Sequence, residues 1–165
     1  MKLNAMVRAS MLGLAVLVSS LTAQALETKR YVSEKYKFSI LFPKDAKIEE
    51  ASHGPWGGAH ASYEGVHVFA ISKLGVQADP EDIEAFGKKL SETDKAQWTA
   101  LGGEKTDEGK HWWKASKAMY GDVIVLAVYG TRPQGSYLSF VKASKSDVEK
   151  HQAEFTECLK SMKLE

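Results

Sequence analysis

The chain has 165 residues, of which 44% are hydrophobic, with a formal net charge of +1 and a single cysteine. This near-neutral balance gives no electrostatic reason to expect nucleic acid or an acidic membrane as a partner, and one cysteine excludes an internal disulfide. The length suits one domain with its own hydrophobic core.

Residues 1–25 have the pattern of a secretory signal peptide. Lys2 and Arg8 give a positively charged start, an apolar run follows at residues 11–18, and Ala23-Gln24-Ala25 forms a small-x-small cleavage site. The apolar run is well short of the roughly 20 residues that span a bilayer as a helix. We therefore predict cleavage after Ala25, with an uncleaved N-terminal anchor as the alternative.

Cleavage at this site leaves a single domain over residues 26–165, which begins at Leu26 and has a formal charge of −1. The only cysteine is Cys158, whereas bacterial lipoproteins carry a cysteine immediately after the cleavage site. We therefore predict a soluble protein of the periplasm or the extracellular space, without a membrane anchor. Cys158 is expected to be a buried apolar residue, with a reactive thiol as the alternative.

The first strong strand pattern is at residues 36–42, where aromatic and aliphatic residues alternate with Lys37 and Ser39. Pro43 ends this strand, because proline cannot donate to a ladder. Weaker patterns, with a break at Gly65, predict further strands at 46–51, 60–63 and 66–72.

The stretch "HGPWGGAH" at residues 53–60 predicts the tip of a hairpin between two of these strands. Its three glycines allow positive φ and Pro55 presets one turn position, so turn geometry accounts for those residues. Turn geometry does not require Trp56, and an exposed indole is typical of binding hot spots. We therefore predict that Trp56 contacts a partner, with an indole folded over a sheet edge as the alternative.

Asp79-Pro80-Glu81-Asp82 predicts the start of a helix, with an acidic N-cap and a proline at the first helical position. Apolar residues recur at helical spacing as far as Leu101, and Gly102-Gly103 ends the pattern. The sequence thus predicts an amphipathic helix over residues 80–101 that packs on a sheet.

Three further strands form a predicted meander at residues 110–120, 123–129 and 137–142. Residues 123–129, "VIVLAVY", are apolar at successive positions, which indicates a central strand covered on both faces. A capping-box pattern at residues 146–149 starts a closing helix. Together these patterns predict an α+β fold with one central antiparallel sheet of about six strands, flanked by helices.

Three histidines are close enough in sequence to suggest a metal site. His53 and His60 flank the glycine-rich tip and His67 is on the adjoining strand, so two or three imidazoles would suit zinc or copper. No H-x-H, H-x-x-x-H or C-x-x-C spacing supports this site, and exposed turn histidines are the alternative. His111 and His151 are expected on the surface.

No pattern of catalytic residues stands out in the sequence. It contains neither a G-x-S-x-G elbow nor a phosphate-binding glycine loop, and the acid pairs Glu49-Glu50 and Glu81-Asp82 are better explained as a strand edge and a helix cap. The neighbours Trp112 and Trp113 point to opposite faces of a strand and are expected in the core. We therefore expect a non-catalytic protein without a cofactor.

Three segments together resemble PsbP-like and DcrB-like secreted domains: "YKFSILFPKD" near the start, "HWWKASKAMYGDVIVLAVYG" with "GSYLSFVKAS" in the meander, and "FTECLKSMKL" at the end. The resemblance extends over about residues 36–163. It implies an α/β/α sandwich around a central antiparallel sheet. It also implies a place among mostly non-catalytic accessory, binding or assembly proteins of the periplasm or the thylakoid lumen.

The leading hypothesis from the sequence is a soluble periplasmic binding or accessory module for an unidentified small ligand or envelope protein. The alternative is a metal-binding protein or metal-dependent hydrolase built on His53, His60 and His67. A purely structural subunit of an envelope complex is a third hypothesis, which the sequence does not separate from the first.

Overall fold

The computed structural model describes residues 25–165, so the predicted signal peptide lies outside the described residues except for Ala25. The elements, in chain order, are β1 (Thr28–Ser33), β2 (Phe38–Pro43), β3 (Lys47–His53), β4 (Trp56–Tyr63), β5 (Val66–Leu74), α1 (Pro80–Leu90), β6 (Thr99–Thr106), β7 (His111–Tyr120), β8 (Val123–Arg132), β9 (Gly135–Ser144), α2 (Lys145–Lys160) and β10 (Lys163–Leu164). No helix within residues 25–165 is long and apolar enough to cross a membrane.

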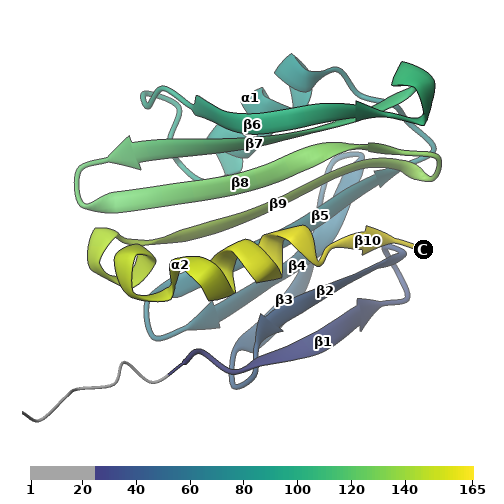
Figure 1. Cartoon of the computed structure of the whole chain (residues 1–165). Coiled ribbons are helices and arrows are strands. Elements are labelled where there is room, and N and C mark those ends of the chain that lie inside the picture. Colours follow the sequence, from purple (N-terminus) through teal and green to yellow (C-terminus); the bar gives the residue numbers. More distant parts are fainter. Residues whose placement is uncertain (1–24) are drawn as a thin grey trace, which may run out of the picture.

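The strands form two antiparallel sheets (Figure 1). The larger sheet has seven strands in the order β3-β4-β5-β9-β8-β7-β6, and the smaller has three in the order β1-β2-β10. The predicted α+β class is confirmed, but the single sheet of about six strands is wrong. The difference arises because β2 leaves the central sheet to pair with β1 and β10, while β6 adds an edge strand to it.

The large sheet is covered on both faces, as the resemblance implied. On one face, Ile83 of α1 shares a core cluster with Leu138 and Phe140 of β9. On the other face, Phe155 of α2 shares a second cluster with Phe38 of the small sheet. Figure 1 shows α2 in front of the large sheet, the small sheet below it and α1 behind. The hydrophobic core is therefore split into two layers by the large sheet.

The apolar segment "VIVLAVY" lies inside the large sheet, as predicted. β8 is hydrogen-bonded to β7 on one side and to β9 on the other. Its successive side chains alternate between the two core layers, with Ile124, Leu126 and Val128 on the α2 side and Val125, Ala127 and Tyr129 on the α1 side. A strand that is buried on both faces needs apolar residues at every position, which explains the unbroken pattern.

The first helix is shorter than predicted. α1 ends at Leu90, where the backbone N–H and the hydroxyl of Ser91 both donate to the carbonyl of Gly87. Trp98 then packs back on the helix from the following loop, so closely that a Cβ on Gly87 would lie 2.7 Å from its indole. The residues that continued the helical pattern are therefore a loop and strand β6, because Trp98 reaches the core from outside the helix.

Two strands of the small sheet have no clear strand pattern of their own. β1 reads "TKRYVS" and is held by its pairing with β2 and by Tyr31, whose ring centroid lies 5.5 Å from that of Phe42. β10 has only two residues, and Lys163 pairs with Ser39 of β2. Both strands are defined by the partner strand rather than by alternation in their own sequence.

Candidate functional site

The large sheet brings His60 and His67 side by side on the face that carries α1. β4 and β5 pair so that His60 faces Phe69, and the ring of His67 then reaches His60 along the sheet. Nε2 of His60 lies 2.9 Å from Nδ1 of His67, and the ring centroids are 5.1 Å apart. At this distance one nitrogen donates its N–H and the other accepts, which requires at least one neutral ring.

A row of stacked rings connects the histidine pair to the core. The rings of His60 and Phe69 are 4.2 Å apart and tilted by 10°, and those of Phe69 and Phe140 are 4.4 Å apart and tilted by 13°. Phe140 is fully buried, whereas His60 and His67 are half-buried. The pair therefore presents imidazole nitrogens near the surface while the ring of His60 is held in place by packing.

Charged side chains near the pair are already engaged with one another. Glu49, which faces His60 across β3 and β4, has Lys47 at 2.6 Å. Lys142, which faces His67 across β5 and β9, has Glu92 at 2.8 Å. Neither Glu49 nor Lys142 is therefore free to form an ion pair with an imidazole of the pair.

The pair favours the neutral form of His60. Burial is the main cause that lowers the pKa of His60, the neighbouring His67 lowers it further, and Glu49 opposes both effects. A second proton on the pair would replace the hydrogen bond by repulsion between two cations. The pair can therefore carry at most one positive charge without losing its hydrogen bond.

We expect the free energy of unfolding to fall as the pH is lowered through the histidine range. The folded state has a lowered pKa for His60, so below about pH 6.5 the unfolded chain binds more protons and stability is lost. Because the pair is partly exposed, solvent screening keeps this loss below about 1 kcal/mol. Urea unfolding of the wild type and of His60→Gln at pH 7.5 and pH 5 measures it.

The free energy of unfolding of the His60→Gln variant should depend less steeply on pH than that of the wild type. His53→Gln is the control, because it removes an exposed histidine from the same hairpin without touching the pair. Equal slopes for the wild type and His60→Gln would show that the pair does not contribute to the pH dependence.

His53 is not part of the histidine pair. It ends β3 opposite Trp56, and its ring centroid lies 6.3 Å from that of Phe86 on α1. His60 follows Trp56 by four residues along β4, a distance of roughly 13 Å at strand spacing. Within residues 25–165, no group of three histidine, cysteine or acidic side chains is placed to hold a metal ion. The structure thus brings together two of the three candidate metal ligands and leaves His53 apart.

The turn in "HGPWGGAH" is much shorter than predicted. Only Gly54 and Pro55 lie between β3 and β4, and Gly54 has a φ of +63°, in the region that favours glycine. Gly57 and Gly58 lie within β4, where the ring of Tyr36 packs against Gly57 and the backbone of β5 against Gly58. These two glycines are needed for close approach of neighbouring groups rather than for the turn.

Trp56 is buried, with 6% of its surface exposed. Its indole stacks on Phe86 of α1, with ring centroids 4.9 Å apart and a tilt of 9°, and Lys73 lies 5.7 Å from the indole centroid. The exposed indole expected from the sequence is therefore wrong, because α1 supplies the apolar surface that the local sequence lacks. A contact of Trp56 with a partner stays a prediction. In this structure the indole is buried, so it is not exposed for such a contact.

The remaining singled-out residues are largely buried. Trp112 and Trp113 pack against opposite core layers, as expected. Cys158 is fully buried, which confirms its expected placement, and burial raises the pKa of its thiol to about 12. The side chains of His111 and His151, expected on the surface, are only 13% and 11% exposed.

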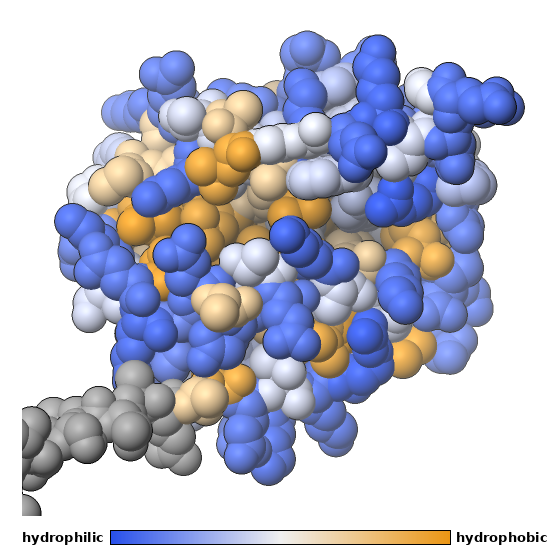
Figure 2. Space-filling view, viewed as in Figure 1, coloured by the Kyte–Doolittle hydropathy of each residue, from blue (hydrophilic) through white to orange (hydrophobic). Residues whose placement is uncertain are grey.

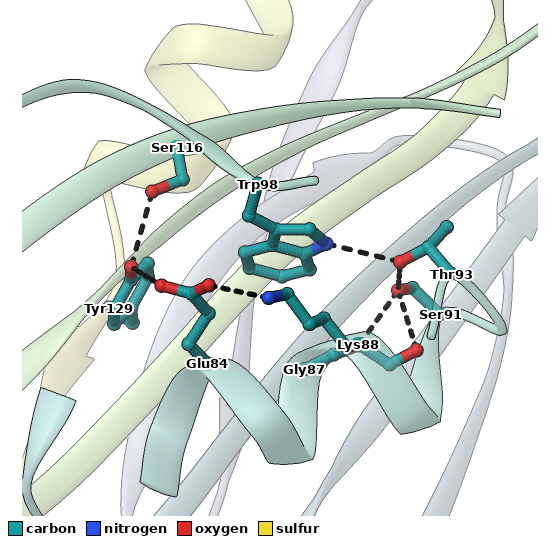
Figure 3. Close-up of polar contacts among 8 residues, drawn as sticks. All are labelled: Glu84, Gly87, Lys88, Ser91, Thr93, Trp98, Ser116 and Tyr129. Atoms are coloured by element: carbon teal, nitrogen blue, oxygen red, sulfur yellow. Dashed lines mark hydrogen bonds and ion pairs between the residues drawn. The ribbon is translucent and has the colours of Figure 1, made fainter. Parts of the chain in front are cut away.

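A polar network that the sequence did not reveal fastens α1 to the sheet (Figure 3). The hydroxyl of Tyr129 donates to Oε2 of Glu84 at 3.2 Å and lies 3.1 Å from Oγ of Ser116, while Lys88 lies 2.8 Å from Glu84. Burial is the main cause that raises the pKa of Tyr129, so its phenol stays protonated and can donate. The i,i+4 spacing of Glu84 and Lys88 was the only signal in the sequence, since the other two residues come from β7 and β8.

A cavity of about 300 Å³ lies where the described chain begins. It is bounded by the segment before β1, the turn after β2, the turn between β4 and β5, and α2. The lining is polar, and Lys44 pairs with Glu27 across it at 2.7 Å. The candidate binding features of the described chain are thus the histidine pair and this cavity, which is lined in part by the chain just after the predicted cleavage site.

Comparison with known proteins supports the fold. No protein-family model matches the sequence, and no curated protein matches it. The solution structure of cyanobacterial PsbP from Synechocystis sp. PCC 6803 matches 90% of this chain and 99% of that chain, with a TM-score of 0.59 and 12% sequence identity. A protein of unknown function from Pseudomonas aeruginosa, PA94, matches 78% of this chain and 91% of that chain, with a TM-score of 0.35 and 10% identity. The match to cyanobacterial PsbP shows that the chain has a PsbP-like fold, while the likeness to DcrB stays a prediction.

Proposed function

We propose that the protein is a non-catalytic accessory or assembly module that works in the periplasm or outside the cell after residues 1–25 are removed. The observation that carries this proposal is the PsbP-like fold, which extends over nearly the whole described chain. The signal-peptide pattern adds the site of action. Its partner on this proposal is an envelope protein or a small ligand, bound without chemistry on the ligand.

One surface of the molecule suits such a contact. Met119 of β7 is 53% exposed, and it lies on the same face of the strand as Trp113 and Ala115, which pack on the core layer under α2. Figure 2 shows hydrophobic side chains gathered beside α2, within a mostly hydrophilic surface. This surface is a suitable place for a probe because α2 packs mainly on β8 and β9, and Met119 of β7 is exposed beside it.

Photo-crosslinking in the native cell tests the proposal. A benzophenone amino acid in place of Met119 should form a defined adduct with a protein or ligand in the envelope fraction, and the same probe in place of Glu34 should not. Glu34 is a fair control because its side chain is 87% exposed and lies in the turn between β1 and β2.

Two results would contradict the proposal. Retention of residues 1–25 in the intact mass of the native protein would remove the export step. Failure of the Met119 probe to form an adduct, together with elution of the native protein as a lone monomer from the envelope fraction, would remove the accessory role. A fixed stoichiometry with one partner would indicate a structural subunit, whereas substoichiometric binding would indicate an assembly factor.

A further inference from the structure

The first described residues are fastened to the closing helix by one specific hydrogen bond. The backbone nitrogen of Leu26 donates to Oε1 of Glu154 in α2 at 3.3 Å, although the two residues are 128 positions apart. The side chain of Leu26 packs against the core layer under α2. Strand pairing begins only at Thr28, so the start of the domain is positioned by the Glu154 carboxylate, by the packing of Leu26 and by the backbone hydrogen bond from Lys44 to Glu27.

The carboxylate of Glu154 has room for a stronger partner. Its side chain is 24% exposed, and the only basic group within 4 Å of it among residues 25–165 is the imidazole of His151, at 3.6 Å. Nδ1 of His151 is buried and has no hydrogen-bond partner within these residues. Glu154 is thus a partly buried acid without a full cationic partner, next to an unused imidazole nitrogen.

The surrounding charges do not supply that partner. The titratable side chains that line the adjoining cavity are Glu27, Lys44, Asp45, Tyr63, Glu64, Lys150 and His151. Lys44 is engaged with Glu27 at 2.7 Å. Within the described residues, Lys150 makes no ion pair with Glu154. A cation at the nitrogen of Leu26 would therefore meet Glu154 without a competing lysine.

Cleavage after Ala25 would create such a cation at the same atom. The amide nitrogen of Leu26 would become an N-terminal ammonium, which carries a full charge and three donor hydrogens. The hydrogen bond to Glu154 would then join two full opposite charges, whereas the donor in the uncleaved chain is a neutral amide. One hydrogen would remain on Glu154, which would leave two further donor hydrogens on the ammonium.

We propose that Glu154 is the binding site for the N-terminal ammonium that processing creates at Leu26, so that cleavage locks the start of the domain onto α2. The inference rests on the export step of the proposed function. The contact depends on cleavage after Ala25, because consecutive residues are up to about 3.6 Å apart and a start one residue earlier or later moves the ammonium out of hydrogen-bond range of Glu154.

The ion pair between the Leu26 ammonium and Glu154, which we call the lock, is stable only within a defined pH range. Ion pairing with Glu154 raises the pKa of the ammonium in the folded state above the roughly 7.7–8.0 of a free α-amino group. The added stability is complete below that range and is lost as the pH rises through the higher folded-state value. At the acid end, hydrogen bonds from the backbone of Glu154 itself and of Leu26 hold the pKa of this carboxyl below its usual value, so the lock is lost as Glu154 becomes protonated.

The test compares a protein that begins at Leu26 with one that keeps Ala25, each with Glu154 or Glu154→Gln. NMR titration of the N-terminal residue should give a raised ammonium pKa only for the Leu26 protein with Glu154. The melting temperature of that protein at pH 6.5 should be about 3 °C above those of the other three. Glu157→Gln is the matched control, because it is an exposed glutamate on the same helix.

Two measurements keep the failure of the lock separate from the failure of export. The intact mass of the native protein shows whether the chain begins at Leu26, and retention of residues 1–25 would overturn both proposals. If the native chain begins at Leu26 but its ammonium titrates alike with Glu154 and Glu154→Gln, the lock is overturned and export stands.

Discussion

Replacement of Trp56 by alanine is expected to lower the free energy of unfolding by about 3 kcal/mol, because it removes a buried indole and leaves a cavity. The indole is 6% exposed and stacks on Phe86 at 4.9 Å, so it joins the β3–β4 hairpin to α1. For a domain of this size the melting temperature should fall by roughly 10 °C. Differential scanning calorimetry with parallel urea unfolding measures both quantities.

Two further variants make the Trp56 result specific. Tyr120→Ala removes an aromatic ring that is 54% exposed, and it should change the free energy of unfolding by no more than about 0.5 kcal/mol. Combining Trp56→Ala with Phe86→Ala should cost less than the sum of the two single changes, by about 0.5–1.5 kcal/mol, because the stacked pair is lost only once. A melting temperature that is unchanged by Trp56→Ala would indicate that the indole is exposed. It would then support the predicted contact of Trp56 with a partner.

Replacement of Gly130 by alanine is expected to destabilise the protein by about 3 kcal/mol through overpacking. Gly130 lies in β8 opposite Trp113, and a Cβ there would overlap the carbonyl oxygen of Trp112 and lie 2.8 Å from Cα of Trp113. Because the obstacle is the backbone of β7, a change of rotamer cannot relieve the clash. Strands β7 and β8 would have to separate.

Gly102→Ala is the matched control for Gly130→Ala. Gly102 lies in the edge strand β6 of the same sheet, and a Cβ there would meet no atom within 4 Å. Loss of backbone freedom in the unfolded chain should make this variant slightly more stable, by about 0.5 kcal/mol. Urea unfolding of both variants separates the two effects, and a similar small change in both would show that β7 and β8 tolerate a wider spacing.

The sequence determined those elements whose pattern depends only on local burial and capping. The unbroken apolar run at residues 123–129 predicted a strand covered on both faces, and β8 lies between two core layers. The proline and acids at residues 79–82 placed the start of α1, since the N-cap and first-turn preferences act within one turn. The burial of Cys158 was also expected, from its place beside the apolar stripe of the last helix.

Only the tertiary structure decided which surfaces those elements cover. α1 ends at Leu90 because Trp98 packs on it from the next loop, and no local pattern encodes that return. The same helix buries Trp56, which the turn sequence alone left exposed. Sheet register, set by pairing of whole strands, joins His60 to His67 and leaves His53 apart. The contact of Leu26 with Glu154 spans almost the whole domain, and chain order gives no signal for it because only packing of α2 beside the first described residues brings the two atoms together.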